Sequence, residues 1–130
     1  MIVPDASAIV EWLLQSERGA RVAKVLFSGT HALHSPHLLD VEVIQGLRRC
    51  EAAGLIRPSR TQEAIQDFLD LPIKRHPHEP LLWRIWDLHG NLVAYDAAYV
   101  ALAETLGATV LTCDVKMGRA SGHYARIELV

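Results

Sequence analysis

Four acidic residues, far apart in the sequence, have the types and settings of a metal site. Asp5 and Asp114 each follow a short apolar run. Asp96 begins an apolar stretch with helical character, and Glu42 lies among apolar neighbours. Carboxylates in such places are costly to remove from water unless a positive charge meets them. Because carboxylate oxygens are the ligands of hard divalent cations, the set predicts a metal site if the fold brings it together.

Apolar periodicity predicts short strands that alternate with longer helices. The strands are expected at residues 1–5, 32–34, 73–75, 109–112 and 126–130. The helices are expected near residues 7–15, 17–28, 36–53, 59–71, 79–90 and 94–106, with a short one after Asp114. This alternation predicts an α/β fold, a three-layer α/β/α sandwich with a mainly parallel central sheet. Sites in such sheets form beyond the carboxyl ends of the strands, where Asp5 and Asp114 belong.

Particular residues mark the expected helix ends. Ser7 is expected to cap the first helix, and Pro36 is expected in the first turn of the third. Gly54 and Gly107 are expected to stop the helices that precede them.

The composition bounds the class of protein. With 130 residues, half of them hydrophobic, the chain predicts a single domain over residues 1–130. Removing the four acids from the net charge of −2 leaves +2, so a polyanionic substrate is not excluded. No apolar stretch is long enough to span a membrane. Cys50 and Cys113 have no metal-like spacing, so a cytoplasmic protein with reduced thiols is expected.

Each acid taken alone has an ordinary structural explanation. Asp5 and Asp114 could cap the helices that follow them, and Asp96 could interact with the positive end of its helix. Glu42 is harder to explain, because its neighbours Val41, Val43 and Ile44 draw it toward the interior. The metal hypothesis therefore depends on the set.

The segments around the acids also match a known family. They are Val3–Ser7, Leu39–Arg49, Tyr95–Glu104 and Leu111–Asp114. In order and spacing they resemble the PIN-domain ribonucleases, and among them the VapC-like toxins of bacterial toxin–antitoxin pairs. The resemblance covers essentially the whole chain, and Tyr95–Glu104 is its most specific part.

The resemblance implies a PIN-like fold and a Mg²⁺- or Mn²⁺-dependent endoribonuclease that leaves a 5′-phosphate and a 3′-hydroxyl. It implies that Asp5, Glu42, Asp96 and Asp114 are the catalytic, metal-binding residues, with Thr112 as a helper. It also implies an RNA substrate, a homodimer, and a complex with a small VapB-like antitoxin. A carboxylate-held cation suits this chemistry, since it polarises the phosphate and acidifies water, while Glu42 or Asp114 could act as general base.

Two positions depart from the family pattern. Gln45 stands where asparagine is expected, which could alter how an amide is placed near the site. Lys116 follows the last acid where another carboxylate could stand, so one-metal and two-metal versions both stay open.

Other classes of function fit less well. A receiver-like phospho-acceptor domain shares the length and the α/β pattern, but it needs an acid pair after the first strand and a strand-end lysine. A PIN fold kept only as a binding module is a third alternative. The histidines at 31, 34, 37, 76 and 78 lack the spacing of a zinc motif.

Basic and aromatic residues provide further candidates. Arg48, Arg49, Arg57 and Arg60 could contact RNA phosphates or simply be solvated near a helix end, and Lys116 and Arg119 are weaker candidates. Trp83 and Trp86 are expected in the core. Trp12, with Leu13 and Leu14, has more apolar area than one inner face of a short helix buries, which predicts part of an antitoxin surface.

Overall fold

Five short strands form one parallel sheet in the computed structural model, which describes residues 1–130. The strands are β1 (Ile2–Pro4), β2 (Leu33–Pro36), β3 (Ile73–His76), β4 (Thr109–Thr112) and β5 (Arg126–Leu129). Their order is β3-β2-β1-β4-β5, and every neighbouring pair is parallel. The first strand is therefore central, and the predicted parallel sheet is confirmed.

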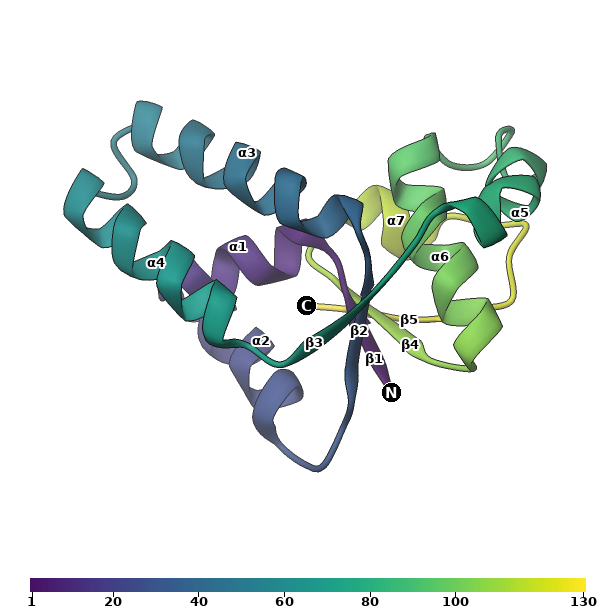
Figure 1. Ribbon diagram of the computed structural model, residues 1–130, viewed down its shortest axis with the longest axis horizontal. Coiled ribbons are helices and arrows are strands. Elements are labelled where there is room, and N and C mark those ends of the chain that lie inside the picture. The colour runs from purple at the N-terminus through teal and green to yellow at the C-terminus, as the bar shows by residue number, and fades with distance from the viewer.

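The helices connect the strands and cover both faces of the sheet. They are α1 (Ala6–Leu14), α2 (Glu17–Phe27), α3 (Leu38–Ala52), α4 (Pro58–Asp70), α5 (Leu82–Asp87), α6 (Ala94–Leu106) and α7 (Val115–Arg119), with the 3₁₀ turn η1 (Glu79–Leu81) before α5. In Figure 1, helices α1 to α4 lie on one side of the sheet, and α5 and α6 lie on the other. The α/β/α sandwich is confirmed. None of the helices combines the length and the hydrophobicity that crossing a membrane requires.

The core forms where the sheet meets α1, α3 and α6. Helix α6 is buried from Ala97 to Ala103 and contacts β1, β2 and β4, which explains its nearly continuous apolar sequence. It ends at Gly107, whose φ of +65° suits a residue without a side chain. Gly19 lets α2 approach α1 closely, because a Cβ there would lie 2.1 Å from the Glu11 carbonyl oxygen.

Two local expectations were wrong. Pro36 does not begin a helix but ends β2, where it is paired with His76 of β3. Strand β2 pairs with β1 only at Leu33. At Pro36 the missing backbone N–H therefore removes no hydrogen bond between β2 and β1. The cap of α1 is Asp5, not Ser7.

Candidate active site

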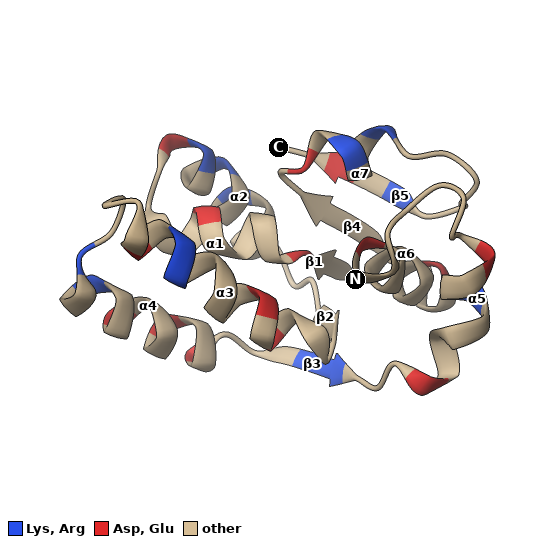
Figure 2. Ribbon diagram, turned by 90° about the horizontal axis from the view of Figure 1, so that it is seen from above, with Lys and Arg blue, Asp and Glu red and all other residues tan.

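The four predicted acids line one pocket beyond the carboxyl ends of β1 and β4. Strands β1 and β4 are neighbours, so Asp5 and Asp114 lie side by side at the ends of these strands. Helix α3 brings Glu42 and helix α6 brings Asp96. The pocket has a volume of about 330 Å³ and is lined by Asp5, Ala6, Ser7, Glu42, Gln45, Arg49, Asp96, Tyr99 and Asp114. Figure 2 shows, in red, acidic backbone segments at the end of β1, within α3 and α6, and just before α7.

Asp5 is the most deeply buried of the four, with 4 % of its surface exposed. Its Oδ1 accepts hydrogen bonds from the Ser7 hydroxyl at 2.6 Å and from the Ala8 N–H at 3.0 Å. Its Oδ2 accepts one from the Thr112 hydroxyl at 2.5 Å. Burial raises the pKa of Asp5, and these hydrogen bonds oppose the rise. Asp5 thus caps α1 and also lines the pocket, so its role as a cap does not remove it from the candidate site.

Ser7 and Thr112 fix the ends of the two central strands to each other. The Ser7 Oγ accepts a hydrogen bond from the Cys113 N–H at 2.9 Å and lies 3.3 Å from Thr112 Oγ1. Thr112 Oγ1 also accepts one from the Asp114 N–H at 2.9 Å. Thr112 is fully buried, as a residue that positions its neighbours should be. The expected place of Thr112 beside the acids is confirmed by these contacts.

Glu42 is held from across the pocket by a core residue. The hydroxyl of Tyr99, on α6, donates a hydrogen bond of 2.5 Å to Glu42 Oε1. Burial raises the pKa of Glu42, and Asp5 adds to the rise, while the Tyr99 hydrogen bond lowers it. Burial and Glu42 also raise the pKa of Tyr99, so its hydroxyl remains a donor.

Asp96 shows most clearly that the acids act on one another. It lies in the first turn of α6 and receives no hydrogen bond from the protein. Burial raises its pKa to about 6, and the charges of Asp114, Asp5 and Glu42 add to the rise. A cation in the pocket would offset this repulsion and so strongly favour the ionised form of Asp96.

The oxygens left free in the pocket suit a hard cation that keeps water ligands. Both oxygens of Asp96 and Oε2 of Glu42 have no protein donor, and Asp114 uses only Oδ1, to cap α7 through the Lys116 N–H at 2.9 Å. No three acidic, histidine or cysteine side chains lie close enough together, as placed, to enclose a metal ion. Mg²⁺ needs no such cage, since it keeps several waters and binds one or two carboxylates directly. The donor set therefore fits Mg²⁺ or Mn²⁺ in an open site.

Three pocket residues were missed or left undecided by the sequence. Ser7 follows Asp5 by two residues, and Tyr99 follows Asp96 by three, one turn along the same helical face. Arg49 follows Glu42 by seven, two turns along α3, and Gln45 lies between them. Helical spacing from an acid was the signal that could have identified Tyr99 and Arg49, whereas Ser7, two residues after Asp5, has no such spacing.

Two of the other candidate arginines, Arg60 and Arg48, are placed outside this pocket. Arg60 pairs with Asp67 at 3.2 Å and donates to the Leu13 carbonyl oxygen at 3.0 Å, so it serves the α1–α4 contact. Arg48 lines a different hollow, between α3 and α4.

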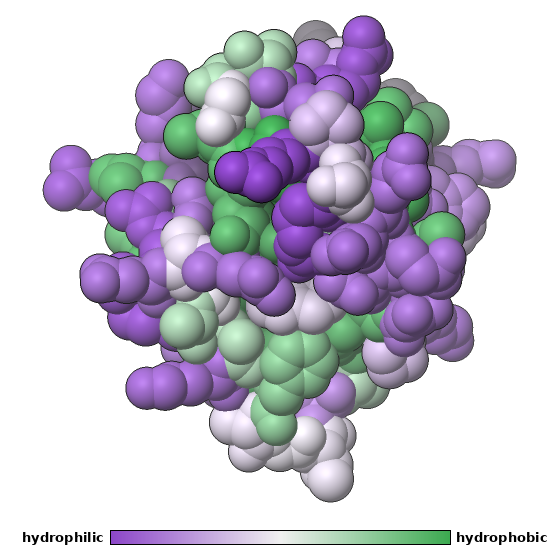
Figure 3. All heavy atoms as spheres, turned by 90° about the vertical axis from the view of Figure 1, so that its left-hand side faces the viewer, coloured by the Kyte–Doolittle hydropathy of each residue, from purple (hydrophilic) through white to green (hydrophobic).

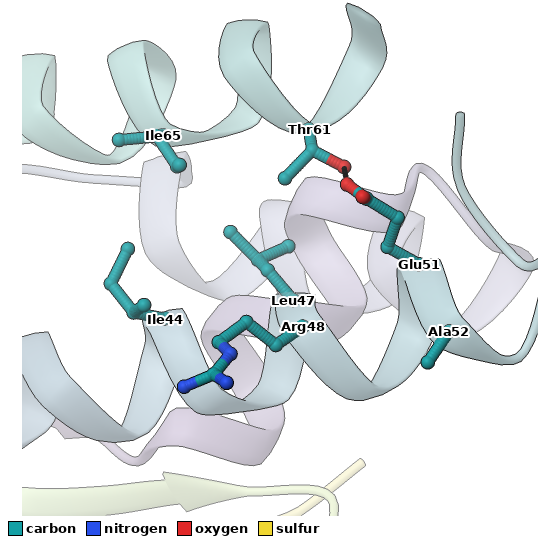
Figure 4. Close-up of a pocket in the computed structure, with 7 residues that line it drawn as sticks. All are labelled: Ile44, Leu47, Arg48, Glu51, Ala52, Thr61 and Ile65. Carbon is teal, nitrogen blue, oxygen red and sulfur yellow. Dashed lines mark hydrogen bonds between the residues drawn. The ribbon is translucent and has the colours of Figure 1, made fainter. Parts of the chain in front are cut away.

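This α3–α4 groove is open and partly apolar. It has a volume of about 300 Å³, and Figure 4 shows Leu47 of α3 pointing toward α4, which carries Thr61 and Ile65, while Arg48 lies along α3 beside Ile44. Apolar patches also show between hydrophilic side chains on the end of the molecule where these helices lie (Figure 3).

The tryptophans differ from expectation. Trp83 and Trp86 are not in the core but 83 % and 62 % exposed, because the short helix α5 buries none of its residues fully. Trp86 stacks on His89, with ring centroids 4.4 Å apart. Trp12 is half-buried and packs edge-on against Phe27 at 5.6 Å, so part of its surface stays open.

The histidines gather in pairs across β2 and β3. His34 Nδ1 lies 2.9 Å from His76 Nε2, and the rings of His37 and His78 are 6.0 Å apart. Neither pair has a third ligand.

Comparison with known proteins gives concordant results. The family model described as PIN domain matches residues 2–122. The chain is 42 % identical to Ribonuclease VapC12 of Mycobacterium tuberculosis over 130 residues, which is 100 % of this chain and 99 % of that protein. It is 38 % identical to VapC ribonuclease Mb0985 of Mycobacterium bovis over 117 residues, 90 % of this chain and 88 % of that protein.

Solved structures share the fold at low sequence identity. PAE2754 from Pyrobaculum aerophilum superposes with a TM-score of 0.72 at 21 % identity, covering 97 % of this chain and 81 % of that one. VapBC2 from Rickettsia felis, bound to a promoter DNA fragment, superposes with a TM-score of 0.62 at 13 % identity, covering 99 % and 98 %. Fold, pocket and relatives agree, and the chain belongs to the PIN domain family, in its VapC branch.

Proposed function

We propose that this protein is a Mg²⁺-dependent endoribonuclease and the toxin of a toxin–antitoxin pair. The observation that carries the proposal is the pocket in which Asp5, Glu42, Asp96 and Asp114 meet, with Asp96 at a pKa of about 6 through burial and the other three charges. The ribonuclease names of the relatives support RNA as the substrate.

Different side chains of the pocket are assigned different roles in phosphodiester hydrolysis. Mg²⁺, when bound, supplies positive charge against the nonbridging phosphate oxygens and acidifies the attacking water. Asp96 and Asp114 offer it their free oxygens. Asp5, fixed by Ser7 and Thr112, holds a negative charge at the buried end of the pocket.

Glu42 is the residue we assign to orient and deprotonate the water. One of its oxygens is fixed by Tyr99 and the other is free. Burial raises its pKa, which makes it a stronger base than an exposed glutamate.

Cleavage of single-stranded RNA with and without Mg²⁺ tests the proposal. Asp96→Asn should lose cleavage while it stays folded, and Asp87→Asn, an exposed acid on α5, is the matched control. Chelation should stop the wild-type reaction, and Mn²⁺ should restore it. Cleavage that persists in chelator, or in Asp96→Asn, contradicts the assignment, and a folded wild type without cleavage indicates a PIN fold used only for binding.

An antitoxin partner follows from the relatives, one of which is a VapBC complex. We assign its docking surface to the α3–α4 groove, because α3 carries groove residues on one face and Glu42, Gln45 and Arg49 on another. A segment bound along α3 therefore reaches the acids. Ile44→Glu should weaken antitoxin binding and spare RNA cleavage by the free toxin, and unchanged antitoxin affinity would exclude the groove.

A homodimer is the expected state of the toxin. The exposed apolar residues of α5 and of the turn before α6 surround a hollow of about 410 Å³, lined by Leu82, Ile85, Trp86, His89, Leu92, Val93 and Ala94. Exposed aromatic residues concentrated in one place are typical of protein interfaces. We assign this α5 face to contact with a second copy of the chain.

A further inference from the structure

Arg49 is a cation at an acidic pocket and has no acidic partner. It lines the pocket together with the four carboxylates, yet it forms none of the four ion pairs of the protein, which join Arg60 to Glu63 and Asp67, Arg75 to Asp40, and Arg84 to Glu104. Its side chain is exposed and donates no hydrogen bond within the protein. All the donors of its guanidinium are therefore available to a ligand.

The position of Arg49 on α3 suggests which ligand. Glu42, Gln45 and Arg49 all line the pocket from α3; Glu42 is half-buried, whereas Gln45 and Arg49 are exposed. Seven residues of α-helix place Arg49 about 10 Å along the axis from Glu42. Arg49 therefore lines the pocket from a point two turns beyond Glu42 along α3, where the next phosphate of a strand that crosses the pocket can meet it.

The charges also favour a polyanion that spans both places. A phosphodiester strand needs a cation for the phosphate that is cleaved and further cations for its neighbours. Guanidinium binds phosphate through two parallel hydrogen bonds, which fixes orientation as well as position.

We propose that Arg49 binds a phosphate that neighbours the cleaved one in a single-stranded RNA, and so positions the strand across the pocket. This inference rests on the proposed ribonuclease function. Arg49 is a positioning residue: it acts on binding and register, while the acids act on the bond that breaks.

Arg48 provides a matched control. It precedes Arg49 on the same helix, is also exposed and carries the same charge, but it lines the α3–α4 groove (Figure 4). Replacing either arginine by glutamine removes one positive charge from α3. Only the Arg49 change removes it from the acidic pocket.

The test measures binding of a labelled oligouridine in chelator, where cleavage is absent, over a series of salt concentrations. Arg49→Gln should weaken binding about tenfold at low salt. It should also reduce the slope of log affinity against log salt by about 0.7, the value expected when a single strand has one neutralised phosphate fewer. Arg48→Gln should leave the slope unchanged. Arg49→Lys should keep the slope but bind more weakly than wild type, because lysine retains the charge and lacks the two parallel bonds.

The outcomes separate this inference from the proposed function. An unchanged slope in Arg49→Gln, with wild-type cleavage of RNA intact, overturns the role of Arg49 alone. The role of Arg49 is also overturned if Arg48→Gln and Arg49→Gln reduce the salt slope equally. The slope would then depend on the total charge of α3 and not on the position of Arg49. If wild type neither binds nor cleaves RNA, both proposals fail.

Discussion

The Tyr99 hydroxyl and Glu42 Oε1 are joined by a hydrogen bond of 2.5 Å that spans the pocket from α6 to α3. Tyr99 is 1 % exposed, so its ring is fixed by the core. It is also three residues from Asp96, and the helix turn that presents one carboxylate therefore sets the orientation of another. The site is coupled to the core by this contact.

Tyr99→Phe should lower cleavage about 10- to 100-fold, the usual cost of losing a group that orients a metal or catalytic ligand. The Mg²⁺ concentration for half-maximal activity should rise, because Glu42 is then free to turn. Metal titrations of cleavage and of thermal stability measure both effects. Tyr95→Phe, an exposed tyrosine on the same helix, is the control, and equal behaviour of the two variants would show that Tyr99 is only a core residue.

Asp5→Asn and Asp96→Asn should both lose cleavage but should differ in stability. In Asp5→Asn the amide nitrogen replaces the oxygen that accepts from Thr112, which should reduce the free energy of unfolding by about 1–3 kcal/mol. Asp96 receives no hydrogen bond and is repelled by the other acids, so Asp96→Asn should melt at or above the wild-type temperature at pH 8. Melting curves in chelator decide this, and a large loss of stability in Asp96→Asn would contradict the placement of Asp96.

The metal-free protein should become less stable as the pH rises from about 4 to above about 6. In the folded state burial and the neighbouring charges raise the pKa of Asp96 to about 6 from its usual 3.8. The folded state therefore binds more protons than the unfolded state in this window, and the free energy of unfolding falls with rising pH. The measurement is the melting temperature in chelator across the window.

Two comparisons isolate the cause of that pH dependence. Asp96→Asn should flatten it, and Mg²⁺ should reverse it, because the cation binds the ionised carboxylates of the folded state. The same slope in wild type and Asp96→Asn would assign the effect to other groups.

Trp86→Ala should convert the dimer to a monomer with little effect on folding, since the Trp86 side chain is mostly exposed. Light scattering coupled to size-exclusion chromatography measures the mass of each variant. Leu55→Ala, an exposed apolar residue in the α3–α4 turn, is the control. A monomeric wild type, or a dimeric Trp86→Ala, would show that α5 is not the interface.

Where local signals were strong, the sequence was enough to predict the elements. Helix 94–106 and strand 109–112 match α6 and β4, because an apolar run is ended by Gly107 and followed by β-branched residues. The tryptophans of α5 were misjudged, since their spacing fits a buried stripe but the helix is too short to bury it. Pro36 was misjudged because a proline at the end of a strand and one in a first helical turn look alike in sequence.

The pocket could be predicted as a set of acids but not as a network. Thr112 and Asp5 are 107 positions apart, and Tyr99 and Glu42 are 57 apart. No periodicity links such pairs, since they meet only through the pairing of β1 with β4 and through the packing of α3 and α6 on β2. Whether the acids bind Mg²⁺ stays a prediction.

Strand β1 is made first during synthesis but lies in the middle of the sheet. Both neighbours of β1 come later in the chain, and β4, which carries Thr112 and leads to Asp114, comes very late. During translation, Asp5 is therefore synthesised well before Thr112, which donates a hydrogen bond to it, and before Asp114. An incomplete chain that lacks β4 has neither the hydroxyl that holds Asp5 nor the fourth acid. If the protein is the ribonuclease proposed above, the pocket should therefore be unable to cleave RNA until β4 and Asp114 have been added to the growing chain.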